Sequence, residues 1–166
     1  MKSIAFAISL FIVISWLVLN VYWYSKKSLS FVQNMIVYMV LSIFIMNYFT
    51  ILSLQLKYIE FTSNKALFLS LLFERGIMSP ISILFFVNLY LLSSTNLMKG
   101  LLTAAALIIL TVFDYLMVTL GILSYPHWNY FYAMLINLVL LFVGLWLAKL
   151  TIVVKKWETQ KNEGNL

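Results

Sequence analysis

Three ionisable residues lie deep inside long apolar stretches of the sequence: Glu74, Arg75 and Asp114. A charged side chain at the centre of a membrane span costs on the order of 3 kcal/mol. Arg75 precedes Thr95 by twenty residues, and Asp114 follows it by nineteen. If the chain turns near Thr95 between two helices, both residues lie about 28–30 Å from the turn, at the same depth. We therefore predict an ion pair between Arg75 and Asp114.

If Asp114 pairs with Arg75, Glu74 needs another partner or stays protonated. Asn47 and Asn137 are placed at a similar depth in two other apolar stretches, and either could supply that partner. Together, Glu74, Arg75, Asp114, Asn47 and Asn137 form the predicted intramembrane polar site. Such a site can simply hold helices together, or it can handle protons or a small anion. The sequence leaves both interpretations open.

Gly76 and Pro80 follow the two charges directly. A proline removes the backbone hydrogen bond to the carbonyl four residues earlier, which here is that of Gly76. Transporters often bind substrates or ions where a helix is interrupted in this way. Prolines are also tolerated in membrane helices when neighbouring groups bond the freed carbonyl. We expect a helix break, in the form of a bend or an opening, between Gly76 and Pro80.

Small residues four apart occur twice, as Gly100 with Ala104 and as Gly144 with Ala148. Such pairs allow two helix backbones to approach closely. Ala104 and Ala148 lie at a similar distance from the same end of their stretches, so they are expected to face each other within one chain. The alternative is an interface between copies of the chain.

The composition restricts the class of protein. Of 166 residues, 64% are hydrophobic and only 10% are charged, which is more apolar surface than a soluble domain of this size can bury. We predict an all-α, polytopic membrane protein: one transmembrane domain over residues 1–166. The predicted spans are 4–24, 31–54, 66–92, 98–123 and 130–154, with short loops and a polar cytoplasmic tail at 157–166. A β-barrel is excluded because alternation of polar and apolar residues is missing.

The lysines indicate an orientation. Six fall on one side of the predicted bundle, namely Lys26, Lys27, Lys99, Lys155, Lys156 and Lys161, and three on the other, namely Lys2, Lys57 and Lys65. By the positive-inside rule the richer side is cytoplasmic, so the N-terminus is expected outside and the C-terminus inside. The Ile-, Asn-, Lys- and Tyr-rich composition resembles small proteins of AT-rich bacterial genomes. A bacterial plasma membrane is the expected location.

Several chemistries have no support in the sequence. There is no cysteine, and His127 is the single histidine, so thiolate sites and His-x-x-x-His metal sites cannot be built. No Gly-rich phosphate loop and no Gly-x-Ser-x-Gly motif occur. The net charge of +6 comes largely from loop lysines that suit lipid headgroups. We therefore expect no cofactor, no metal, no enzyme activity and no nucleic-acid partner.

Two functions remain in competition. The first is a non-enzymatic accessory or regulatory subunit that binds another membrane protein. The second is an oligomeric transporter or channel that uses Glu74, Arg75 and Asp114 for protons or a small anion. A lipid-modifying enzyme is a minor third alternative. The expected partners are membrane lipids and either another membrane protein or a second copy of the chain.

Overall fold

The computed structural model describes residues 2–163, and its regular secondary structure is helical except for one pair of two-residue strands. There are two short π-helices: η1 continues α2, and η2 joins α3 to α4. The elements, in order, are α1 (Lys2–Tyr24), α2 (Phe31–Thr50), η1 (Ile51–Gln55), β1 (Glu60–Phe61), α3 (Lys65–Phe73), η2 (Glu74–Met78), α4 (Ser79–Leu92), α5 (Asn96–Thr119), β2 (Leu123–Ser124) and α6 (Tyr130–Glu163).

Five helical units are long and apolar enough to cross a membrane, which confirms the expected number of helices. They are Ile4–Tyr24, Phe31–Gln55, Lys65–Leu92, Asn96–Thr119 and Tyr130–Trp157. Polar caps begin three of them: Ser30 and Gln33 form a reciprocal capping box, and Asn64 and Thr95 accept backbone N–H bonds. Each cap bonds N–H groups that have no partner inside the helix, so it fixes where the helix starts.

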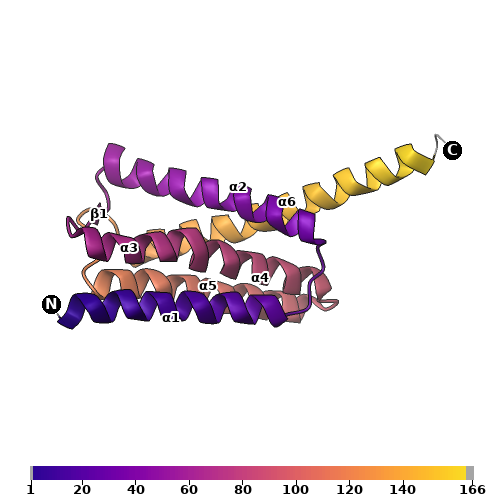
Figure 1. Cartoon of the computed structure of the whole chain (residues 1–166). Coiled ribbons are helices and arrows are strands. Elements are labelled where there is room, and N and C mark those ends of the chain that lie inside the picture. Colours follow the sequence, from indigo (N-terminus) through magenta and orange to yellow (C-terminus); the bar gives the residue numbers. More distant parts are fainter. Residues whose placement is uncertain (1, 164–166) are drawn as a thin grey trace.

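Two boundaries differ from the sequence prediction by three or more residues. The fourth unit ends at Thr119 rather than near 123, because Gly121 has a φ of +68° and turns the chain away from the helix. The segment 157–163, expected as a polar tail, continues α6 as helix, while 164–166 lie outside the described residues. With 34 residues, α6 is about 51 Å long. Figure 1 shows its C-terminal part projecting beyond the other helices.

The helices run alternately up and down, so the connections gather at two ends of the bundle (Figure 1). At one end the α2–α3 and α5–α6 connections are joined by the antiparallel strands β1 and β2, with Glu60 opposite Ser124 and Phe61 opposite Leu123. The α1–α2 and α4–α5 connections lie at the other end. Lys26, Lys27 and Lys99 therefore share one end of the molecule.

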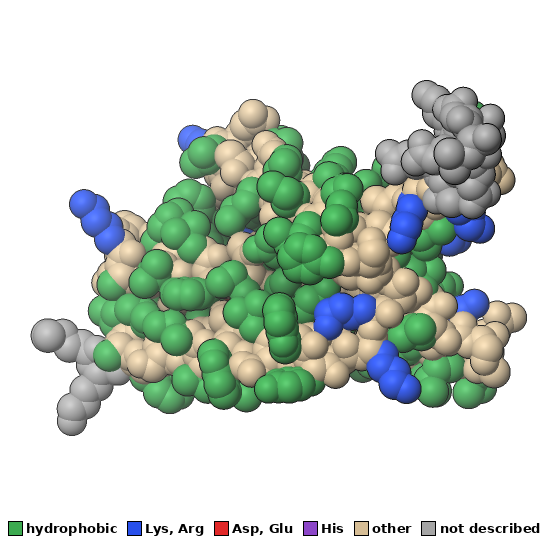
Figure 2. Space-filling model, turned by 45° about the vertical axis from the view of Figure 1, so that its right-hand side comes forward, with side chains coloured by type: hydrophobic (Ala, Val, Ile, Leu, Met, Phe, Trp, Pro, Cys, Tyr) green, Lys and Arg blue, Asp and Glu red, His purple; other side chains and the backbone are tan. Residues whose placement is uncertain are grey.

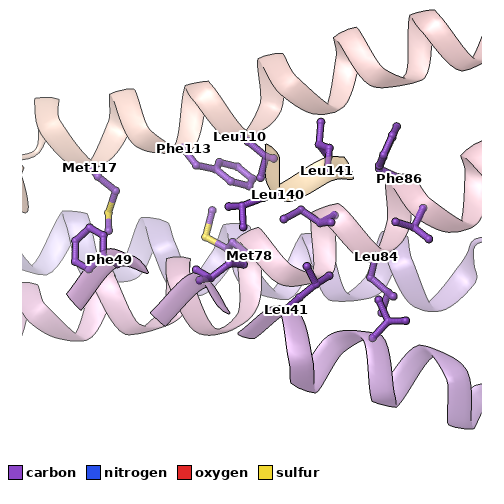
Figure 3. Close-up of a cluster of buried hydrophobic side chains, with 14 of the residues drawn as sticks. Leu41, Phe49, Met78, Leu84, Phe86, Leu110, Phe113, Met117, Leu140 and Leu141 are labelled. Atoms are coloured by element: carbon purple, nitrogen blue, oxygen red, sulfur yellow. The ribbon is translucent and has the colours of Figure 1, made fainter. Parts of the chain in front are cut away.

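The α3–η2–α4 unit is the centre of the bundle. In its most apolar stretch 56% of the residues are buried, against 17% in α1 and 22% in α5. It contacts α1, α2, α5 and α6. Figure 3 shows the buried core on one side of it, where Leu41, Leu84, Leu110 and Leu141 come together from α2, α4, α5 and α6. The charged pair at 74 and 75 thus lies in the least exposed helix of the protein.

Candidate functional site: a buried ion cluster

The predicted pair between the third and fourth helical units is present. Nη2 of Arg75 donates a hydrogen bond to Oδ1 of Asp114 over 2.6 Å. Both side chains are buried, with no more than 4% of either exposed. A charge-assisted bond of this kind is short and strong, and here it joins η2 to α5.

Glu74 is the second carboxylate beside the same guanidinium. Its Oε2 lies 2.8 Å from Nε of Arg75, but the N–H is not aligned for a hydrogen bond, so the attraction is electrostatic. The Ser79 hydroxyl donates to the other oxygen, Oε1. The hydrogen-bond partner of Glu74 is therefore Ser79, one turn along the same helical unit, and neither of the two asparagines expected from the sequence.

Asn137 on α6 belongs to the cluster, but it bonds Asp114 and not Glu74. Its Nδ2 donates to Oδ2 of Asp114 over 2.8 Å, and the side chain is buried. Both oxygens of Asp114 are thus bonded, one from η2 and one from α6. The aspartate links three helical units.

Asn47 was placed in the polar site by the sequence, and this was wrong. Its side chain is exposed and donates to the carbonyl of Ile43 in its own helix. The next residue, Tyr48, takes the inward position because it is rotated by about 100° around α2. The Tyr48 hydroxyl accepts a 3.3 Å bond from Nη1 of Arg75, and the ring of Phe49 lies 4.9 Å from the guanidinium carbon. Helix α2 does contribute to the cluster, through residues that the sequence did not single out.

The expected helix break between Gly76 and Pro80 is a local widening rather than an opening. Residues Glu74–Met78 form a π-helix, in which the N–H of Ser79 bonds the carbonyl of Glu74. The Tyr38 hydroxyl donates to the Gly76 carbonyl over 2.8 Å, which replaces the bond that Pro80 cannot make. The helix therefore stays continuous from α3 to α4. Single π-turns of this kind occur frequently at functional sites.

The two small-residue pairs have different surroundings. Ala148 is buried, and a Cβ added at Gly144 would lie 2.8 Å from Cγ2 of Ile83, so α6 packs closely on α4. Gly100 and Ala104 are exposed, and an added Cβ at Gly100 meets nothing within 4 Å. The expectation that Ala104 faces Ala148 was wrong, because the small face of α6 is turned toward α4 and α2 instead of α5.

A second buried polar group, at the opposite end of the bundle, was missed. Asn88 on α4 accepts from the backbone N–H groups of Ser28 and Leu29, and it donates to Oδ1 of Asn34. This fixes the α1–α2 connection against α4. An asparagine deep in an apolar run was a signal for such a contact, as it was for Asn137.

Two carboxylates surround one guanidinium, so the formal charge of the three groups is −1 if all are ionised. No group of three or more His, Asp or Glu side chains within the described residues could hold a metal ion. In the α5–α6 connection, burial raises the pKa of Tyr125, and the nearby Asp114 carboxylate raises it further. That phenol therefore stays neutral and can only donate or accept hydrogen bonds.

The chain matches no protein-family model, no curated protein and no solved structure.

Proposed function

We propose that the chain is a multi-pass protein of a bacterial plasma membrane, with its N-terminus outside and its C-terminus in the cytoplasm. Five apolar helices support the membrane location. The orientation rests on the excess of lysines at the end that carries Lys26, Lys27 and Lys99. The composition typical of AT-rich genomes supports the bacterial origin.

We further propose that it is a non-enzymatic partner of another membrane protein, an accessory or regulatory subunit. In this account the ion cluster is structural. Each carboxylate is hydrogen-bonded inside the cluster. Asp114 accepts from Arg75 and from Asn137, and Glu74 accepts from Ser79. The side chains of the three charged residues are at most 4% exposed. The charges therefore fix a rigid bundle, and binding is left to its outer faces.

The observation that carries this proposal is the unfilled small-residue face of α5. The Gly144 position is tightly packed inside the chain, whereas Gly100 and Ala104 are exposed. Beside Gly100, a hollow between α4, α5 and α6 is lined by Tyr90, Thr103 and Phe142 among others. Small residues let a second helix approach closely, and adjoining aromatic side chains add contact area. A helix of a partner protein fits this combination.

The test is affinity purification from native membranes in mild detergent, comparing wild type with Ala104→Leu. Leucine there would block close approach, so we expect a stoichiometric partner to be lost in the variant while its melting temperature is unchanged. The matched control is Ala5→Leu, which enlarges an exposed alanine on α1 and should retain the partner. A partner that survives Ala104→Leu would contradict the proposal. So would a purified complex that contains only copies of this chain.

A transporter or channel is the second candidate, and one observation favours it. The cluster holds two carboxylates for one guanidinium, and Glu74 and Arg75 lie within a π-helix, so a proton would balance the excess negative charge. The corresponding test is proton or anion flux into liposomes. Glu74→Gln or Asp114→Asn should abolish the flux, and Glu60→Gln, in the β1 strand outside the spans, should not. Flux that persists with 74, 75 and 114 all neutralised would exclude this mechanism.

A further inference from the structure

A groove runs between α1 and α2 over the surface of η2 and α4. Its volume is about 720 Å³, within the range of pockets that bind small molecules. The groove exists because the two helices, although consecutive in sequence, have their main contacts elsewhere: α1 packs on α3, η2 and α4, and α2 packs on α6 and α4. In the following paragraphs it is called the α1–α2 groove.

The walls of the α1–α2 groove are apolar along most of its length. Its walls include Trp16 and Trp23 from α1 and Met35 from α2. Its floor includes Ile77 of η2 and Ile81 of α4. Trp16 and Trp23 are separated by seven residues, or about 10 Å along a helix. The hydrocarbon of one membrane leaflet is about 15 Å thick, half of a 30 Å core. The distance between the two tryptophans is therefore about two thirds of the thickness of one leaflet, enough for a segment of an acyl chain.

One end of the α1–α2 groove is cationic. Lys27 is one of the lining residues at this end. Its Nζ is held by three contacts: it donates to the carbonyls of Trp23 and Ser25, over 2.9 and 3.3 Å, and it lies 4.9 Å from the centre of the Tyr22 ring. An ammonium has three N–H donors, so the third can bond a ligand oxygen. Lys26 adds a second positive charge beside it.

The negative charges of the described side chains lie away from this end. Glu60 is in β1 at the opposite end of the bundle, and Glu74 and Asp114 are buried in the cluster. Figure 2 shows that hydrophobic side chains cover the middle of the face in view, and that lysine or arginine side chains lie toward its two ends. An apolar channel with a fixed cation at one end is complementary to an amphiphile with an anionic head.

We propose that the α1–α2 groove binds one anionic phospholipid, with its phosphate at Lys27 and one acyl chain along the groove toward Tyr38. The proposal rests on the membrane location proposed above, but it is independent of the α5 face and of its partner protein. Because Tyr38 lines the groove and donates to the Gly76 carbonyl, the acyl chain would reach the residue that stabilises the π-helix. Lipid binding would therefore support the helix that carries Glu74 and Arg75.

The experiment is native mass spectrometry of the full chain, purified in mild detergent and titrated with phosphatidylglycerol or phosphatidylcholine. We expect one retained phosphatidylglycerol per chain at concentrations where phosphatidylcholine is not retained. Lys27→Gln should lower phosphatidylglycerol occupancy about fivefold, as expected for the loss of one lysine at an anionic surface. The charge-matched control Lys26→Gln, one residue away but outside the groove lining, should lower it much less.

A second pair of variants tests the apolar part. Met35→Trp inserts bulk into the α1–α2 groove and should reduce lipid retention. Met39→Trp, at an exposed methionine of the same helix that does not line the groove, should not. Melting temperatures close to that of wild type qualify each variant for comparison.

Equal retention of the two lipids, or equal losses at the paired positions, would mean non-specific contact with bulk lipid and would overturn the proposal. The proposal would also be overturned if phosphatidylglycerol stayed bound to Met35→Trp while this variant lost the protein partner, because the groove would then bind protein and not lipid. Loss of the partner in Ala104→Leu is measured on a different face. Failure of the lipid proposal is therefore distinguishable from failure of the partner proposal.

Discussion

Nη2 of Arg75 and Oδ1 of Asp114 lie 2.6 Å apart, although 39 residues separate them in the sequence. Asn137 bonds the other oxygen of the same aspartate, and Tyr48 accepts from the other terminal nitrogen of the same guanidinium. One ion pair thus connects helices from four of the five helical units. In the proposed membrane location, lipid competes with every hydrophobic contact, so such directed bonds would decide which helices are neighbours.

The Tyr38 hydroxyl should contribute measurably to stability, because it bonds the carbonyl that Pro80 leaves free. We expect Tyr38→Phe to reduce the free energy of unfolding by about 1 kcal/mol, measured by SDS titration in mild detergent. The control is Tyr132→Phe, at an exposed tyrosine of α6, which should be neutral.

The same interpretation predicts a coupling with position 80. In Pro80→Ala the backbone N–H is restored and can donate to Gly76, so adding Tyr38→Phe should cost less than it does in wild type. Equal losses in the two backgrounds would show that the tyrosine acts through packing alone.

The two glycine positions should respond in opposite directions to alanine. Gly144→Ala places a Cβ 2.8 Å from Ile83 and should destabilise the chain by about 1–3 kcal/mol through overpacking. Gly100→Ala meets open space and should be neutral or stabilising by up to about 1 kcal/mol, since alanine favours the helix. Melting temperatures of the two variants in the same detergent compare them directly, and the reverse order would contradict the assigned packing of α6.

Asn88 should be important for the end of the bundle near the α1–α2 connection. Asn88→Ala removes the acceptor of two backbone N–H groups and the donor to Asn34. We expect a loss of about 2–4 kcal/mol, because buried N–H groups would be left unbonded. Hydrogen exchange should accelerate at Ser28 and Leu29. Asn47→Ala, at the exposed asparagine of α2, is the control, and an equal loss there would refute this distinction.

Sequence reasoning succeeded where a single physical rule applied. Residue counting from Thr95 was enough to pair Arg75 with Asp114, because an α-helix has a constant rise and the connection is short. Counting from the outer end of its own apolar stretch placed Asn137 at the correct depth. Hydrophobic length alone predicted five helices, since few polar residues interrupt them.

Rotation about the helix axis was much harder to predict. Asn47 and Tyr48 are neighbours at the same depth, yet only Tyr48 faces the cluster. Helices such as α1 and α2 are apolar on most sides, so polarity does not mark their inner face. The small-residue pairs failed for the same reason: their spacing predicted close approach but not which helix is approached. The strand pair β1–β2 lies in the loops, where two residues per strand are too few for a periodic pattern.

The central claim is that the buried charges hold the bundle together, and a double-mutant cycle tests it most directly. Wild type, Arg75→Leu, Asp114→Leu and the double variant would be compared by melting temperature and by SDS-induced unfolding. Arg75→Leu leaves two carboxylates without their counter-ion, so it should lose about 3–5 kcal/mol. Asp114→Leu should lose less, because Arg75 keeps Glu74.

In the double variant, stability should recover part of what Arg75→Leu loses, because only Glu74 is then left without its counter-ion, instead of two carboxylates. Asn47→Leu, at an exposed polar position of α2, controls for the effect of added leucine. Recovery in the double variant is the result that the structural account predicts. If all four proteins have the same melting temperature, stability does not require the charges. The claim that the buried charges hold the helices together is then contradicted.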